Sequence, residues 1–232
     1  MLYRKERTMA KYVFFDLDGT LTQSHFGILR SAEYALSKFD ITMDDPEKRR
    51  LFLGPPLTVS FHDLFGLEGD DVTKAIEYYR ECYKGGAYKE APLYDGIKEL
   101  LDSLSKRGLI LMVVTSKPRV LAKKVVEHFD IDKYFYKVIG PDEEKKSAGK
   151  EDLIKEALEE IRKMKPEGGE EDLPELAKEA VMIGDREFDI KAAKNLGLTA
   201  IGALYGYGTR DELENAGADH IAEHPREINS II

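Results

Sequence analysis

Short apolar runs recur along the chain and predict the buried strands of a sheet. The clearest five are residues 12–15, 109–114, 136–139, 181–183 and 199–204. Their apolar positions are mostly continuous rather than alternating, which is the pattern of parallel strands that are buried on both faces. The runs therefore predict a parallel sheet.

Helical periodicity fills several of the stretches between these runs. Apolar side chains recur at helical spacing in two segments, at Ile97, Leu100, Leu101 and Leu104 and at Leu153, Ile154, Ala157, Leu158 and Ile161. Gly108 and Gly197 stand where helix C-caps are expected. The alternation of strand and helix predicts an α/β fold with a doubly wound, Rossmann-like parallel sheet as its core.

Residues 22–92 interrupt this rhythm, because they contain no convincing buried strand. Helical patterns follow one another at residues 26–39, 47–53, 59–65 and 70–82. Ser24 is the expected N-cap of the first of these helices. The segment is therefore expected to be all-helical.

This helical segment is either an elaboration without function or a lid inserted after the first strand. Its position favours a lid, since it leaves and rejoins the α/β part at the carboxyl edge of the sheet, where ligands bind. We therefore expect a core domain formed by residues 1–21 and 93–232 and a helical cap domain formed by residues 22–92.

The composition of the chain excludes several classes of protein. The chain has 232 residues and 42% hydrophobic positions, enough for a full core without a disulfide or metal staple. Its 35 Lys and Arg against 44 Asp and Glu give a net charge of −9, which argues against nucleic acid and against a membrane surface as partners. The single cysteine, Cys82, excludes a disulfide framework and fits a reducing compartment, so a cytoplasmic protein is expected.

The first chemical motif is DLDGT, directly after the first apolar run. Asp16 and Asp18 are two residues apart, so on an extended segment both side chains converge on one point beyond the strand. Gly19 allows the chain to turn away sharply. Two carboxylates at one strand end are costly unless a cation or a proton lies between them. The alternative interpretation is a turn with a helix cap, because Asp-Gly is a common turn pair.

Further polar groups follow the other predicted strands. The segment GDREFD supplies Asp185 and Asp189, and VVTSKP supplies Thr115 and Ser116. Lys150 opens the helix GKEDLIKEAL. Carboxylates from two strand ends form a site for a hard cation such as Mg²⁺. Together with a hydroxyl and an ammonium, they suit phosphoryl transfer to a carboxylate nucleophile.

Taken in their order along the chain, DLDGT, VVTSKP, GKEDLIKEAL and VMIGDREFDI resemble the motifs of the haloacid dehalogenase (HAD) superfamily, in its phosphoglycolate phosphatase-like branch with a helical cap. The resemblance covers essentially the whole chain. It implies that Asp16 is the nucleophile and that Asp18 is the general acid and base, with a backbone carbonyl that binds Mg²⁺. It also implies that Asp185 and Asp189 bind the metal, Asp189 directly or through water, and that Thr115 binds the phosphate.

The lysine of this family has three candidate positions in this chain, because the segment reads KKSAGKEDL rather than the common Lys-Pro form. Lys150 is favoured as the stabilising lysine, since it begins a helix and Leu153 follows at the expected apolar spacing. Lys145 and Lys146 are the alternatives. Ser116, a further candidate for substrate binding, stands where many relatives have Asn.

Two loops are further candidates. The segment LGPPL resembles a loop of the family's cap, so Gly54, Pro55 and Leu57 are candidate contacts of the substrate. The alternative there is a plain turn between helices. The glycine-rich segment 202–209 lacks the lysine of a nucleotide-binding loop, so a place near the active site is expected instead.

The leading functional prediction is a Mg²⁺-dependent phosphatase that hydrolyses a small phosphomonoester such as phosphoglycolate. A 5'-nucleotidase and a phosphomutase of similar architecture fit the same residues, and the non-enzyme alternative is a phospho-accepting receiver-like module. A dehalogenase is disfavoured, because its chemistry needs neither Asp18 nor Asp185. The expected partner is a small phosphorylated metabolite, and the expected state is a monomer or a homodimer.

Overall fold

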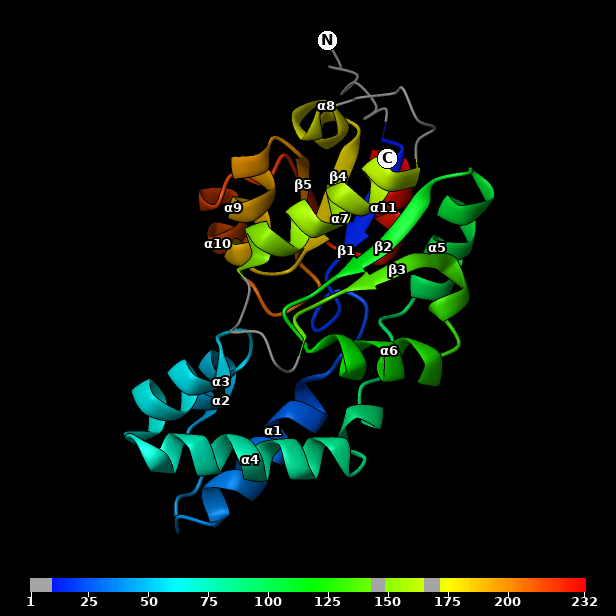
Figure 1. Ribbon diagram of the computed structural model, residues 1–232. Coiled ribbons are helices and arrows are strands. Elements are labelled where there is room, and N and C mark those ends of the chain that lie inside the picture. Colours follow the sequence, from blue (N-terminus) through cyan, green and yellow to red (C-terminus); the bar gives the residue numbers. More distant parts are fainter. Residues whose placement is uncertain (1–9, 143–148, 165–171) are drawn as a thin grey trace. The chain divides into compact units, whose positions relative to one another are not determined.

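The computed structural model describes residues 10–142, 149–164 and 172–232 (Figure 1). The chain divides into two compact units. One is formed by Met1–Leu21 and Leu93–Ile232, and the other by Thr22–Pro92. The first is called the core unit and the second the helical unit.

The core unit is built on one sheet of six strands, all of whose neighbours pair in parallel. The strands are β1 (Tyr12–Phe15), β2 (Ile110–Val114), β3 (Phe135–Ile139), β4 (Ala180–Gly184), β5 (Thr199–Ala203) and β6 (His220–Ala222). The spatial order is β3-β2-β1-β4-β5-β6. The predicted doubly wound α/β fold is confirmed, and the five expected strands are present with ends shifted by one residue at most.

Helices cover both faces of this sheet. They are α5 (Ile97–Lys106), α6 (Arg119–His128), α7 (Lys150–Met164), α8 (Leu173–Lys178), α9 (Glu187–Leu196), α10 (Arg210–Asn215) and α11 (Pro225–Ile231). Tyr12 and Phe14 of β1 belong to a buried cluster with apolar side chains of α7, α8 and α9. Val13 and Phe15 alternate with them and point to the opposite face, where α5 packs against β2 and α11 (Figure 1).

The strand order indicates where along the sheet a ligand would bind. From β1 the chain winds outward through β2 to β3, and it then returns to lay β4 on the other side of β1. The switch of direction therefore lies between β1 and β4, which is where ligands bind in doubly wound sheets. Phe15 lies opposite Ile183 in this pair, so the residues that follow the two strands emerge side by side.

The helical unit contains no strand, and all of its residues are described. Its elements are α1 (His25–Ser37), α2 (Pro46–Phe52), α3 (Leu57–Val59), a π-helix (Ser60–Leu64), α4 (Asp70–Lys84) and a 3₁₀ turn (Ala87–Lys89). Phe52, Phe61 and Tyr79 pack edge-on or tilted in its interior. Ser24 stands at the N-cap of α1, but its side chain makes no capping hydrogen bond.

Two local features complete the fold. Gly108 and Gly197 follow α5 and α9 with φ of +78° and +81°, the left-handed conformation in which a helix commonly ends. Within the described residues, no helix has the length and apolar character needed to cross a membrane.

Candidate active site

Asp16 is placed by the pairing of β1 with β4. It directly follows β1, and its backbone N–H donates to the Ile183 carbonyl at 2.9 Å, so the ladder fixes its backbone. The chain then leaves the extended conformation and turns at Gly19, whose φ is +87°. A Cβ atom at Gly19 would lie 2.2 Å from Asp185 Oδ2, so only glycine fits this approach of the first motif to the fourth.

Asp185 directly follows β4, and its side chain is fully buried. Thr20 Oγ1 donates to Asp185 Oδ1 at 3.0 Å, and the Tyr207 backbone N–H donates to Oδ2 at 2.9 Å. Each carboxylate oxygen therefore has a fixed donor. Such bonds from a hydroxyl and a backbone amide orient a carboxylate without neutralising its charge.

Asp189 lies in the first turn of α9, where it forms part of the helix cap. Its Oδ2 accepts the Arg186 backbone N–H at 3.2 Å, and the residue is 2% exposed. A Cβ atom at Gly184 would lie 2.2 Å from the Asp189 Cβ, which explains why β4 ends in glycine. The capping geometry thus turns the carboxylate of Asp189 toward the end of the sheet.

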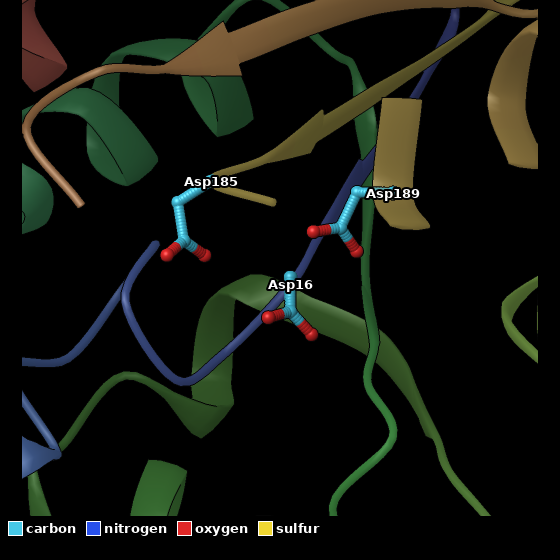
Figure 2. Close-up of side chains that lie close together, drawn as sticks. All are labelled: Asp16, Asp185 and Asp189. Atoms are coloured by element: carbon cyan, nitrogen blue, oxygen red, sulfur yellow. The ribbon is translucent and has the colours of Figure 1, made fainter. Parts of the chain in front are cut away.

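The three carboxylates of Asp16, Asp185 and Asp189 point toward one another (Figure 2). One oxygen from each lies within 4.8 Å of the others, and all three residues are buried. Asp18 is not a member of this cluster. The expectation that alternation would bring Asp16 and Asp18 to one point rests on an extended chain, and the backbone bends directly after Asp16.

Lys150, the first residue of α7, neutralises part of this charge. Its ammonium lies 2.8 Å from Asp16 Oδ1 and 2.7 Å from Asp189 Oδ1, and it donates to the Val114 carbonyl at 3.2 Å. Its side chain is 7% exposed. The alternative candidates Lys145 and Lys146 lie outside the described residues. Lys150 therefore links the end of β1, the end of β2 and the start of α9.

Burial and mutual repulsion shift the pKa values of these groups. Burial, aided by Asp189, raises the pKa of Asp16 to about 6 although Lys150 opposes the change. Burial also raises the pKa of Asp185 well above its usual range, and the charges of Asp16 and Asp189 add to the effect. Burial alone disfavours the ammonium of Lys150, but Asp16 and Asp189 outweigh it and raise that pKa.

This arrangement fits a hard divalent cation. Three carboxylates face a single ammonium, so a net negative charge is buried at the strand ends. Mg²⁺ binds oxygen ligands at about 2.1 Å, which brings them about 3 to 4 Å apart. One carboxylate oxygen from each residue lies within 4.8 Å of the others, so small side-chain movements would bring the three oxygens to this spacing. The cluster is thus able to hold a metal ion.

The β2 end contributes Thr115, Ser116 and Lys117. Thr115 is 1% exposed, its backbone N–H donates to the Ile139 carbonyl at 3.0 Å, and its Oγ1 accepts the Lys117 backbone N–H at 3.2 Å. Ser116 is exposed. The Lys117 ammonium contacts both carboxylate oxygens of Asp18, at 2.7 Å and 2.5 Å.

Comparison with known proteins agrees with this geometry. Residues 13–203 match the family of haloacid dehalogenase-like hydrolases. The chain belongs to this family. A 5'-nucleotidase of Pseudomonas aeruginosa is 38% identical over 203 residues, which cover 87% of this chain and 86% of that protein.

Two further relatives extend the comparison. A phosphoglycolate phosphatase of Vibrio parahaemolyticus is 28% identical, with 96% of each chain covered. A crystal structure of a predicted phosphatase from Clostridium acetobutylicum is 40% identical with a TM-score of 0.84, and covers 95% of this chain and 97% of that one. The expected family and the expected enzyme class, a HAD-type phosphoric monoester hydrolase, are confirmed. The receiver-like alternative is thereby set aside.

Sequence reasoning about this HAD-like site missed two side chains. Thr20 is fully buried and holds Asp185, and Lys117 is 9% exposed and holds Asp18. Both stand inside motifs that were recognised, DLDGT and VVTSKP. The signal that could have found them is their position at the same strand ends, Thr20 two residues after Asp18 and Lys117 one residue after Ser116.

The predicted cap loop lies in the helical unit. Gly54 is exposed and has a φ of +112°, a conformation that favours glycine. Pro55 and Leu57 are half-buried, and Leu57 is the first residue of α3 rather than part of the turn. Their contact with a substrate stays a prediction.

The glycine-rich loop after β5 packs closely against Asp185 of the carboxylate cluster. A Cβ atom at Gly206 would lie 2.3 Å from the Asp185 Cβ and 2.4 Å from the Gly19 carbonyl oxygen. At Gly208 it would lie 2.1 Å from the Asp185 carbonyl oxygen. The loop therefore needs glycine to approach Asp185 and to present the Tyr207 N–H to it.

We expect Gly206→Ala to lower kcat/KM by about a hundredfold, because the methyl group displaces Asp185 and a shift of about 1 Å has this cost. Overpacking of this kind also costs about 1–3 kcal/mol of stability. The control is Gly149→Ala, where the nearest atom to a Cβ is 3.9 Å away. Steady-state kinetics and thermal unfolding measure both effects. Wild-type kinetics for Gly206→Ala would show that this packing does not constrain the site.

Proposed function

We propose that this protein is a Mg²⁺-dependent phosphatase that hydrolyses a small phosphomonoester through an aspartyl-phosphate intermediate. The observation that carries the proposal is the buried cluster of Asp16, Asp185 and Asp189, bridged by Lys150, at the ends of β1 and β4. A nucleophile, a cation site and a fixed ammonium lie together there, and phosphoryl transfer needs these three groups.

In the first half of the proposed reaction, a carboxylate oxygen of Asp16 forms a bond to phosphorus while the bond from phosphorus to the leaving oxygen breaks. Asp18, in its acid form, gives a proton to that leaving oxygen. In the second half, a water molecule attacks phosphorus, its proton passes to Asp18, and the bond to Asp16 breaks. Asp18 thus regains the proton that it gave away, and the cycle closes.

The remaining residues have charge-balancing roles. Asp16, Asp185, Asp189 and the backbone carbonyl of Asp18 would hold Mg²⁺, which when bound neutralises charge on the phosphoryl oxygens. The Lys150 ammonium also lies beside Asp16, where it stabilises negative charge on the transferred group. Thr115, fixed between β3 and Lys117, would direct its hydroxyl to a phosphoryl oxygen.

The substrate proposed first is phosphoglycolate, as expected for this branch of the family. A nucleoside 5'-monophosphate is the second candidate, because the relative that is 38% identical over 203 residues is a 5'-nucleotidase. Both are small phosphomonoesters of the kind that a closing helical cap encloses. A cytoplasmic location belongs to the same proposal and is supported by the presence of one cysteine in the chain.

The test is a panel of phosphomonoesters assayed with Mg²⁺, with EDTA and with Ca²⁺. We expect turnover with Mg²⁺ only, and inhibition by Ca²⁺, because Ca²⁺ prefers more ligands at longer distances than Mg²⁺ does. Phosphoglycolate and nucleoside 5'-monophosphates are compared by kcat/KM. Full activity in excess EDTA would refute the metal requirement, and no turnover of any ester would refute the function.

The cap loop is proposed to contact the part of the substrate that is not phosphate. We expect Leu57→Ala to lower kcat/KM on the preferred metabolite about tenfold, the effect of removing a small apolar contact. Hydrolysis of p-nitrophenyl phosphate changes much less, because this ester needs chiefly the core residues. Leu51→Ala, an exposed leucine of α2, is the control. Equal losses on both esters would assign Leu57 to the fold instead.

A further inference from the structure

Lys117 holds Asp18 in a contact that the proposed reaction does not yet use. The Lys117 side chain is 6% exposed, whereas that of Asp18 is 23% exposed. The ammonium spans both carboxylate oxygens of Asp18, at 2.7 Å and 2.5 Å. A buried lysine that meets both oxygens restricts the rotation of the carboxylate as well as its position.

The backbone of Lys117 is itself fixed on three sides. Its N–H donates to Thr115 Oγ1 at 3.2 Å, and Pro118 follows it, which restricts the conformation of the preceding residue. A Cβ atom at Gly140 would lie 2.6 Å from the Lys117 carbonyl oxygen, so the end of β3 packs directly on this loop. Lys117 therefore projects from a rigid support, as a residue that orients another one must.

The two acids of DLDGT thus have different cationic partners. Lys150 reaches Asp16 from the start of α7, and Lys117 reaches Asp18 from the loop after β2. Asp18 lies outside the carboxylate cluster and is more exposed than Asp16. Asp16 thus lies among the proposed metal ligands, whereas the Asp18 carboxyl group lies outside them, as suits an acid that exchanges protons with the leaving oxygen and the attacking water.

We propose that Lys117 is a positioning residue that fixes the Asp18 carboxyl group for both proton transfers of the reaction. The proposal rests on the proposed function, because it takes the role of Asp18 from it. In the first transfer the proton moves from Asp18 to the leaving oxygen as its bond to phosphorus breaks. In the second it moves from the attacking water to Asp18 as the bond from phosphorus to Asp16 breaks. Both transfers need the carboxyl group within hydrogen-bond reach of the reacting oxygen.

The test is Lys117→Met, which keeps the length of the side chain and removes its charge. Two esters are compared, an alkyl phosphate and p-nitrophenyl phosphate. We expect kcat on the alkyl ester to fall about a hundredfold, the usual share of a positioned acid or base. The p-nitrophenolate ion leaves without a proton, so the first half survives with this ester. A burst of one nitrophenolate per enzyme should therefore precede slow turnover, and a phosphoryl group should accumulate on Asp16, as seen by mass spectrometry of acid-quenched protein.

A double-mutant cycle separates this role from general damage. If Lys117 acts through Asp18, Lys117→Met costs little more once Asp18→Asn is present. Lys117→Arg, which keeps a charge that reaches both oxygens, should be at least about ten times more active than Lys117→Met. Lys123→Met, at an exposed position of α6, is the matched control and should behave as wild type.

Three results would overturn the proposal: equal losses on both esters without a burst, additive losses in the cycle, or equal activity of the Arg and Met variants. If Lys117→Met does not fold, the Arg variant and the Asp18→Asn background decide by the same criteria. The proposed function fails separately, and takes this inference with it, if the wild type turns over neither ester and no variant carries phosphate on Asp16. If the wild type forms phosphorylated Asp16 and Lys117→Met leaves its amount unchanged, the role of Lys117 is refuted and the proposed function stands.

Discussion

Asp16→Asn should lower kcat by at least about a thousandfold, which corresponds to a loss of about 4 kcal/mol of transition-state stabilisation. Excess Mg²⁺ should not restore the activity of the variant. The attacking atom is proposed to be a carboxylate oxygen of Asp16, and an amide at the same place is a poor nucleophile. The substitution also removes one charge from a cluster of three buried carboxylates. The variant should therefore fold, because an amide at this position avoids the burial of a charge and the repulsion from Asp189 that together raise the pKa of Asp16 to about 6.

The matched control is Asp152→Asn, the same change in the first turn of α7, on a side chain that is 67% exposed. It should retain wild-type kinetics. Thermal unfolding confirms that both variants are folded, and mass spectrometry after acid quench shows which of them carries phosphate. Activity of Asp16→Asn within tenfold of wild type, in protein free of contaminating phosphatase, would remove Asp16 from the role of nucleophile.

The core of the fold was predictable because its strands are continuous apolar runs. Such runs are the signature of strands covered on both faces, and β1 with its fully buried Val13 and Phe14 is the clearest case. β6 was missed, since His220 and Ile221 are only half-buried and the strand has three residues. An edge strand that buries little apolar surface leaves little periodicity to detect.

The residues of the site that directly follow strands were predictable from the sequence. The contacts that side chains make between distant loops were not. Asp16 and Asp185 follow adjacent strands, so topology alone brings them together. Lys117 reaches Asp18 across 99 positions of sequence, and Thr20 reaches Asp185 across 165. Such pairs depend on how a loop turns after its strand, which the hydrophobic pattern does not encode. Gly206 is similar, since its need for glycine arises from the approach of Asp185.

Lys150→Met should separate metal binding from catalysis. The Lys150 ammonium lies between the carboxylates of Asp16 and Asp189. Removing one partner of a buried ion pair leaves uncompensated charge and costs about 3 kcal/mol. We expect kcat to fall by about a thousandfold, because the transferred phosphoryl group loses a fixed positive charge. Lys155→Met, on the same helix with a side chain that is 48% exposed, is the control.

The pH dependence of the metal-free protein gives a second readout. The folded pKa of Asp16, about 6, lies above its ordinary value of 3.8, so between these pH values the folded state binds protons that the unfolded state has released. The free energy of unfolding therefore falls as pH rises through this window. The raised pKa of Lys150 contributes stability that is constant at any pH well below 10.5. Thermal unfolding in EDTA should accordingly show lower stability at pH 8 than at pH 5.

Lys150→Met should enlarge both the pH effect and the response to metal. Without the ammonium, which lowers the pKa of Asp16, the folded protein holds its protons to higher pH and loses more stability between pH 5 and 8. Mg²⁺ then meets three carboxylates with no competing charge, so at pH 8 it should raise the unfolding temperature of the variant more than that of wild type. A smaller Mg²⁺ response in the inactive variant would contradict the placement of Lys150 among these carboxylates. A larger one would show that the lysine serves the reaction at the expense of metal affinity.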